Sequence, residues 1–155
     1  MGVNSLGCRK ASHWGTADFE SQIFRLQLAH RCEEAFALVQ AENVRTDPRW
    51  YELSAELKLD CQAKTGQRQY GEEALDLVNA GIQRFPTSSR LVFLKGYVNG
   101  GLGELGVARR YYEDALKLAN ENIAADRSGG RNTADDRRVA KNAAENLAAT
   151  WKPAP

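Results

Sequence analysis

The sequence predicts an all-α protein of about three antiparallel helix-turn-helix hairpins followed by a C-terminal capping helix. Two observations predict this class: apolar residues recur at helical spacing, and one short motif returns along the chain. In the stretch 91–121, Leu91, Leu94 and Val98 are spaced by three and four residues. After a glycine-rich break, a second set has the same kind of spacing: Val107, Ala108, Tyr111, Tyr112, Ala115 and Leu118. This stretch therefore predicts two helices folded back on each other.

The composition is that of an ordinary globular protein. The 155 residues are about one domain in length, and 43% of them are hydrophobic and 26% charged. A formal net charge of +1 gives no reason to expect a nucleic acid or a membrane surface as partner. Because no apolar run is long enough to cross a bilayer, we expect no membrane span.

The three cysteines cannot all pair within one chain, and the spacing of Cys8, Cys32 and Cys61 fits no zinc motif. We therefore interpret Cys32 and Cys61 as small buried residues in a reducing compartment and expect a cytoplasmic protein. The first ten residues lack the apolar core of a signal peptide. A periplasmic or lipid-anchored location stays the alternative if a signal segment was removed.

The first hairpin is expected at about 16–46, after a leader, 1–15, without periodicity. Thr16 or Asp18 is expected to cap its first helix, which runs to about His30. The buried stripe of this helix is Phe19, Ile23 and Leu26. Its second helix should run from Glu33 to about Arg45, before the helix-breaking pair Asp47-Pro48.

The second hairpin is expected at about 48–86. It opens with Trp50, Leu53 and Leu57 at helical spacing. Several residues beyond a minimal hairpin predict a lengthened helix or a loop around 64–66. The returning helix should then run from Gly71 to about Phe85 and end before Pro86.

The third hairpin is expected at about 89–125, which completes a repeat region over 16–126. The Ser- and Gly-containing segment 127–132 is expected to be a linker. A capping helix over 133–151 should follow, before a tail at 152–155. Its buried stripe is expected to be Val139, Ala143, Leu147 and Trp151.

An internal repeat supports these hairpins. Glu33-Glu34-Ala35, followed by Leu38, Val39 and Ala41, returns as Glu72-Glu73-Ala74, followed by Leu77, Val78 and Ala80. Ala35, Ala74 and Ala108 are then equivalent positions, separated by 39 and 34 residues. Such spacing is typical of stacked helical repeats.

The third hairpin resembles a tetratricopeptide (TPR) repeat in its pattern of small and aromatic residues. The matching residues are Gly96, Gly103, Ala108, Tyr112 and Ala115, whereas Val92, Lys95, Asn99 and Asn120 depart from the pattern. The resemblance implies a short right-handed solenoid of TPR-like repeats.

The sequence offers no set of reactive residues that would converge in one site. His13 falls in the leader and His30 at a helix end, and neither has a carboxylate or cysteine partner at ligand spacing. The run Gly100-Gly101-Leu102-Gly103 lacks the Lys-Ser/Thr of a phosphate loop and is interpreted as a turn. We therefore expect no enzyme, no catalytic residue, no metal and no cofactor.

The resemblance also implies a concave groove lined by the first helix of each repeat. In the TPR register, the residues that face this groove are Tyr51, Ala55, Lys58, Arg90, Phe93 and Tyr97. The alternative is that Phe93 and Tyr97 pack against neighbouring repeats. The basic and Asn residues with which some TPR domains clamp a C-terminal carboxylate are absent, because Phe93 and Tyr97 occupy two of their positions.

The predicted function is a non-catalytic scaffold that binds a partner peptide or helix through Tyr51, Lys58, Arg90, Phe93 and Tyr97. The alternative is a structural subunit that self-associates through an end repeat or through the C-terminal helix.

Overall fold

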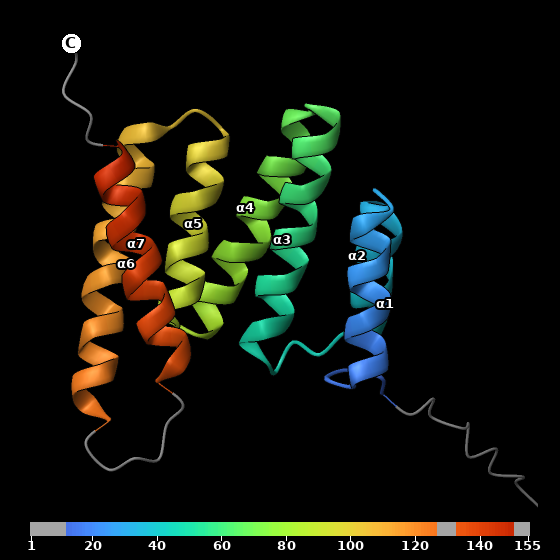
Figure 1. Cartoon of the computed structure of the whole chain (residues 1–155), viewed down its shortest axis with the longest axis horizontal. Coiled ribbons are helices and arrows are strands. Elements are labelled where there is room, and N and C mark those ends of the chain that lie inside the picture. Colours follow the sequence, from blue (N-terminus) through green and yellow to red (C-terminus); the bar gives the residue numbers. More distant parts are fainter. Residues whose placement is uncertain (1–11, 127–132, 151–155) are drawn as a thin grey trace, which may run out of the picture.

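The computed structural model describes residues 12–126 and 133–150, and each regular element within those ranges is an α-helix. The helices are α1 (Ala17–Leu28), α2 (Cys32–Glu42), α3 (Pro48–Thr65), α4 (Arg68–Arg84), α5 (Ser89–Gly101), α6 (Leu105–Ala125) and α7 (Ala134–Thr150). Figure 1 shows them standing side by side in three antiparallel hairpins, with α7 against the third hairpin. The expected all-α solenoid is therefore confirmed.

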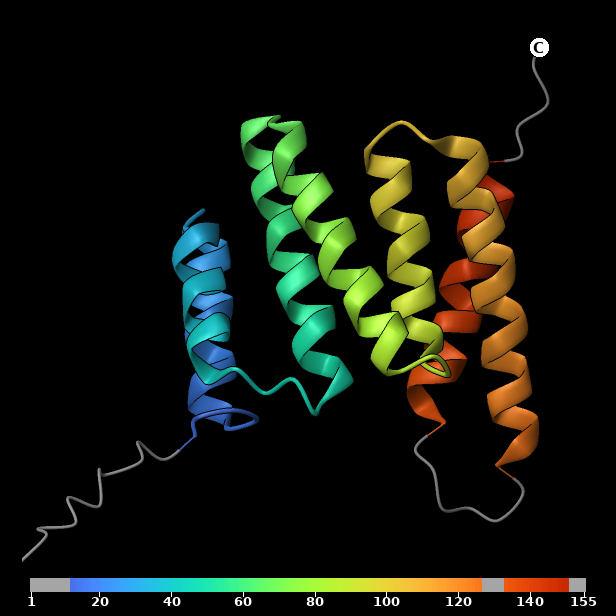
Figure 2. The same cartoon turned by 180° about the vertical axis from the view of Figure 1, so that it is seen from behind.

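The helices form two layers. α1, α3, α5 and α7 lie toward the viewer in Figure 1, and α2, α4 and α6 lie toward the viewer after a half turn in Figure 2. α7 packs on both α5 and α6, as the first helix of a further repeat would. The C-terminal helix therefore covers the open side of the third hairpin.

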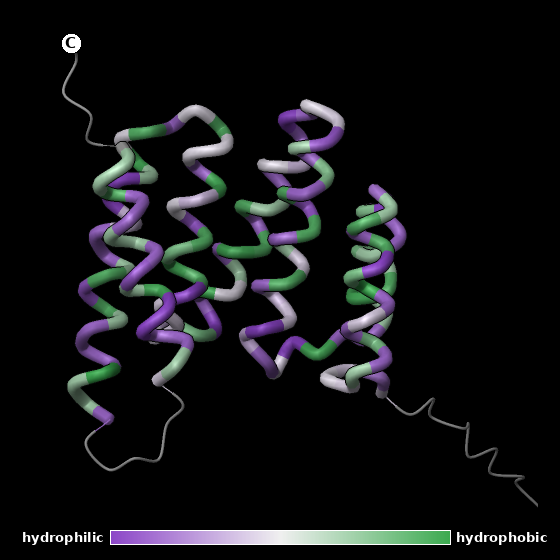
Figure 3. The backbone as a smooth tube through the Cα atoms, in the orientation of Figure 1, coloured by the Kyte–Doolittle hydropathy of each residue, from purple (hydrophilic) through white to green (hydrophobic). Residues whose placement is uncertain are grey.

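Apolar side chains pack the hairpins together in several clusters. One cluster joins the first two hairpins through Phe19, Ile23, Val39, Trp50 and Leu57 and extends to Leu91 on α5. Another joins the third hairpin to α7 through residues that include Tyr112, Val139 and Ala143. Hydrophilic and hydrophobic residues alternate along each helix (Figure 3), because one face is buried and the other is in water.

Local capping fixes where the first three helices begin and end. The Thr16 side chain accepts a hydrogen bond from the backbone N–H of Phe19, as expected for an N-cap. α2 ends at Glu42 and not near Arg45, because Asn43 adopts the left-handed conformation (φ 48°). Asp47 caps α3, which already begins at Pro48.

The three alanines of the repeat occupy matching places. Ala35, Ala74 and Ala108 each lie in the second helix of a hairpin and are fully buried. The longer spacing between the first two arises because α3 has 18 residues whereas α5 has 13. The lengthened helix expected near residue 65 is therefore present, and the repeat register holds.

Two glycines shape the third hairpin. A Cβ atom at Gly96 would lie 2.9 Å from the Tyr112 ring and 3.1 Å from the Ala108 carbonyl oxygen, so α5 and α6 approach closely there. Gly103, in the turn, has φ +85°, a backbone conformation that residues with a side chain rarely adopt. The expected contact between small residues thus explains how this hairpin closes.

Replacing Gly96 with leucine should overpack the α5–α6 contact and lower the free energy of unfolding by about 1 to 3 kcal/mol. The matched control is Gly106→Leu, because a Cβ atom there would meet no atom within 4 Å. Urea titration followed by circular dichroism measures both. Equal unfolding free energies for the two variants would contradict the close approach.

The expectation of two reduced cysteines is wrong: Cys32 and Cys61 form a disulfide. Both residues are buried, as expected, but their Cα atoms lie 5.5 Å apart, within the usual range for a bridge. The bond links the start of α2 to the C-terminal part of α3 and so connects the first hairpin to the second.

Several expectations fall outside the described residues: most of the leader with Cys8, the linker 127–132, Trp151 and the tail 152–155. Within the part of the chain that the structure describes, no helix combines the length and apolarity that crossing a bilayer requires.

Candidate partner-binding groove

Two hollows lie side by side along the layer that contains α3 and α5. The first, of about 310 Å³, is called here the charged hollow, and the second, of about 520 Å³, the apolar hollow. They share Leu59, Ala63 and Tyr97 as lining residues, so they form one continuous groove.

The two hollows differ in chemistry. The apolar hollow is lined by Leu59, Gln62, Ala63, Gly66, Tyr97, Gly100, Gly101, Leu105 and Tyr112. The charged hollow is lined by Glu56, Leu59, Asp60, Ala63, Arg90, Phe93, Leu94, Tyr97 and Asn142. Asn142 comes from α7, which therefore forms one end of the groove.

Tyr97 is an accessible aromatic side chain that lines both hollows of this groove. It is 52% exposed, whereas Phe93 is only 9% exposed. The Phe93 ring stacks on Tyr97, with centroids 6.4 Å apart, and packs against Tyr112 at 5.4 Å. Phe93 thus belongs largely to the core and supports Tyr97, which is free to contact a partner.

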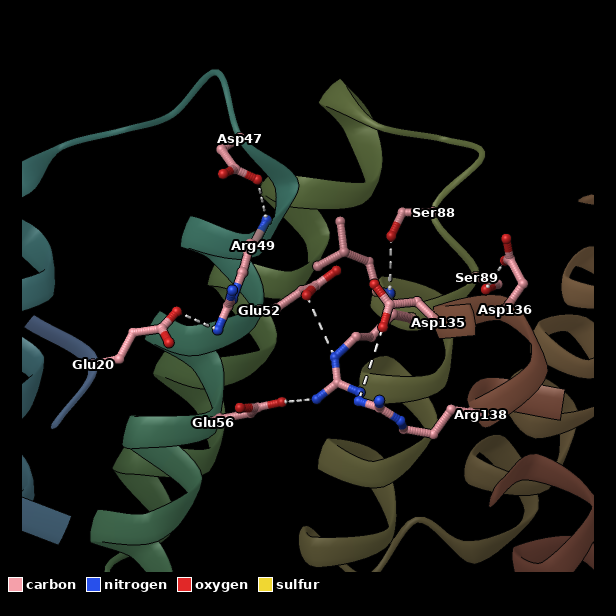
Figure 4. A network of polar contacts seen from close by, with 12 residues as sticks. Glu20, Asp47, Arg49, Glu52, Glu56, Ser88, Ser89, Asp135, Asp136 and Arg138 are labelled. Atoms are coloured by element: carbon pink, nitrogen blue, oxygen red, sulfur yellow. Dashed lines mark hydrogen bonds and ion pairs between the residues drawn. The ribbon is translucent and has the colours of Figure 1, made fainter. Parts of the chain in front are cut away.

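Arg90 is held by two carboxylates of α3. Its guanidinium lies 3.4 Å from Glu52 and forms a shorter ion pair with Glu56. Figure 4 shows Glu52 and Glu56 near Asp135 and Arg138 of α7, which pair with each other at 3.9 Å. These groups line a third hollow of about 260 Å³, which continues the charged hollow through Glu56 and Arg90.

The first turn of α7 is fixed beside this network. Asp136 accepts hydrogen bonds from the Ser89 hydroxyl of α5 (2.6 Å) and from the Asn122 side chain of α6 (3.0 Å). Ser89 is buried, and its hydrogen bond to Asp136 is partly buried. The groove end formed by α7 is therefore held in place by polar bonds as well as by apolar packing.

Burial raises the pKa of Glu52 to about 7, although the Arg90 guanidinium acts in the opposite direction. The nearby carboxylates Glu56, Asp135 and Asp47 raise this pKa further. Glu52 thus carries an incompletely compensated charge near neutral pH, because Arg90 is shared between two acids.

The stability contributed by Glu52 should fall as the pH rises. Its folded-state pKa, about 7, lies above the ordinary value of 4.5, so protonated Glu52 favours the fold. This contribution is complete below about pH 4.5 and is lost as the pH rises through about 7, by up to about 3 kcal/mol. We expect the free energy of unfolding of the wild type to fall relative to that of Glu52→Gln, by up to this amount, between pH 5 and pH 8. Urea unfolding at the two pH values measures this difference.

The control for this measurement is Glu113→Gln on α6, because Glu113 pairs with Arg109 at an exposed site. Its stability difference from the wild type should be the same at both pH values. If the free energy of unfolding of Glu52→Gln changed with pH in the same way as that of the wild type between pH 5 and pH 8, the raised pKa of Glu52 would be contradicted.

Three of the expected groove residues, Tyr51, Ala55 and Lys58, lie elsewhere. Tyr51 is buried in the core and packs on Trp50 and Phe85, with ring centroids 5.0 and 6.2 Å away. Lys58 pairs with Glu73 of α4 at 2.7 Å, and its ammonium lies 4.0 Å from the centre of the Phe36 ring. None of the three lines the charged or the apolar hollow.

The face of α3 that lines the groove is displaced by about one residue from the TPR register. Ala55 is fully buried, whereas its neighbour Glu56 lines the charged hollow. One residue corresponds to a rotation of about 100° around a helix, enough to exchange a buried face for an open one. The sequence analysis missed this face, which the apolar pair Leu59 and Ala63, at i and i+4, could have indicated.

Among the residues that the structure describes, no reactive set is assembled at the groove. His30 is exposed at the end of α1, and Cys61 is buried in its disulfide. Among residues 12–126 and 133–150, no group of three or more His, Cys, Asp and Glu side chains is arranged to hold a metal ion. The described groove therefore offers shape, apolar surface and charge for binding.

The fold is shared with a known binding protein. The crystal structure of PcrH in complex with the chaperone binding region of PopD superposes with a TM-score of 0.62 and 19% sequence identity. The match covers 86% of this chain and 88% of that chain. No protein-family model and no curated protein matches the sequence. The chain thus has a TPR-like helical fold.

Proposed function

We propose that the protein is a non-catalytic scaffold that binds a segment of a partner protein in the groove formed by the charged and apolar hollows. The observation that carries this proposal is the exposed Tyr97, which lines both hollows and whose ring stacks on that of the buried Phe93. Aromatic side chains of this kind often dominate binding energy once a partner removes them from water. The fold supports the proposal, since PcrH was crystallised with a region of PopD.

The expected set of partner-binding residues stays a proposal, and the structure supports some of these residues more strongly than others. Tyr97 lines both hollows, whereas Phe93 and Arg90 line only the charged hollow. Tyr51 and Lys58 have structural partners, so we assign them a role in holding the repeats together. Membership of the TPR family itself is likewise proposed, on the repeat register and on the TPR-like fold.

The test is binding of peptides selected from a random 12-residue library displayed on phage. Peptides selected on the wild-type chain should lose about tenfold or more in affinity for Tyr97→Ala, measured by fluorescence anisotropy, because the exposed ring is the central contact. The matched control is Tyr111→Ala, since Tyr111 lies on α6 and lines a separate hollow. Affinity for this variant should stay within about threefold of the wild type.

Selection of no peptide that depends on Tyr97 would refute the groove as a binding site. Circular dichroism of both variants should match the wild type, because Tyr97 is more than half exposed. The comparison then reports binding and not folding.

Self-association is the alternative function, and one feature favours it. Phe24 and Leu28 lie one turn apart on α1 and are 59% and 65% exposed. An uncovered pair of this kind at an end repeat is a candidate contact between copies. Molar mass measured over a concentration series, for the wild type and Phe24→Ser/Leu28→Ser, distinguishes an assembling subunit from a monomeric scaffold.

The expected cytoplasmic location stays a prediction. Disulfides persist mainly in oxidising compartments, so the Cys32–Cys61 bond favours the periplasmic alternative. The absence of an enzyme function is likewise proposed, on the lack of a convergent reactive set in the described groove.

A further inference from the structure

The groove changes from uncharged to acidic along its length, and this change selects among partner segments. Among the described residues, no charged side chain lines the apolar hollow. The charged hollow presents two carboxylates, Glu56 and Asp60, and one guanidinium, Arg90. A segment that spans both hollows therefore meets apolar surface at one end and acidic groups at the other.

The cation of the charged hollow is already engaged. Arg90 contacts both Glu52 and Glu56, so one positive charge faces two acids. Asp60 has its own partner, Lys64, at 3.2 Å. An acidic side chain from a partner would have to displace Glu52 or Glu56 from Arg90, whereas a basic side chain would compensate the second carboxylate.

The distance between the two chemistries sets a spacing. Glu56 lines only the charged hollow and Gln62 only the apolar one; both lie on α3, six residues apart, which corresponds to about 9 Å along the helix axis. In a polyproline II segment, residues i and i+3 lie on the same side and about 9 Å apart. In a β-strand, residues i and i+4 lie on the same side and about 13 Å apart.

The geometry points to a partner segment that places an apolar side chain in the apolar hollow and a lysine or arginine beside Glu56, three or four residues away. This inference rests on the proposed function and names the chemistry of its ligand. The apolar residue supplies the buried anchor on Leu59 and Tyr97. The basic residue supplies selectivity, because its charge is complementary only at the charged hollow.

The experiment uses a synthetic 10-residue peptide derived from the random-library selection, in three versions with Lys, Gln or Glu at the position of the basic residue. The Lys peptide should bind the wild-type chain about tenfold more tightly than the Gln peptide, and the Glu peptide should bind most weakly. In Glu56→Gln the preference for Lys over Gln should fall to within about threefold. Asp60→Asn, a second conservative variant in the same hollow, should reduce it in the same direction.

Glu113→Gln, on α6 away from the groove, is the control and should leave the full preference for the Lys peptide. Binding that depends on Tyr97 but shows no preference for Lys, or prefers Glu, would overturn this inference and leave the proposed function intact. Failure to obtain any peptide that depends on Tyr97 would overturn both.

Discussion

Replacing Trp50 with alanine is expected to lower the free energy of unfolding by about 3 to 5 kcal/mol. Trp50 is only 2% exposed and lies where the first hairpin meets the second. Its indole N–H donates a hydrogen bond of 2.9 Å to the Val39 carbonyl of α2. The substitution therefore removes a large buried ring together with a bond between the two hairpins, and the cavity can close only by moving whole helices.

Urea unfolding followed by circular dichroism measures this loss, and Trp14→Ala provides the matched control. Trp14 lies at the edge of the same cluster, and its ring N–H donates to the Asp47 side chain at 3.0 Å. Because Trp14 is only partly buried, its loss should cost clearly less than that of Trp50. Equal losses for the two variants would show that Trp50 is not the main contact between the hairpins.

The hairpins were predictable because their signals are local. Helical spacing of apolar residues and the returning Glu-Glu-Ala motif depend only on neighbours along the chain, and the buried Ala35, Ala74 and Ala108 confirm the register that they indicate. The end of α2 was missed for an equally local reason. Asn43 tolerates the left-handed conformation and ends the helix before Pro48 is reached.

The groove was less predictable because it depends on how the helices rotate against one another. A register taken from a repeat family places Ala55 and Lys58 in the groove, but packing turns Ala55 into the core and Lys58 toward Glu73. The ion pairs between Arg90 and Glu52 or Glu56 join residues from different repeats. These groups are distant along the chain, and only the packing of α5 against α3 brings them together.

Removing the disulfide should lower the free energy of unfolding by about 3 to 4 kcal/mol, because the bond closes a loop between residues 29 positions apart. The bond restricts the unfolded chain, and in the folded protein it joins α2 to α3. Cys32→Ala/Cys61→Ala and the wild type in reductant should both show the loss in urea titration. Cys8→Ser is the control, since it leaves the bridge intact.

The state of the cysteines can be counted independently of stability. The chain has three cysteines, so a denatured but unreduced sample should expose one thiol to a chromogenic thiol reagent, and a reduced sample three. Three reactive thiols in the unreduced sample would show that the bond does not form. In a reducing compartment the same protein would lack this connection between its first two hairpins. The bond thus ties the stability of the N-terminal repeat to the compartment in which the protein folds.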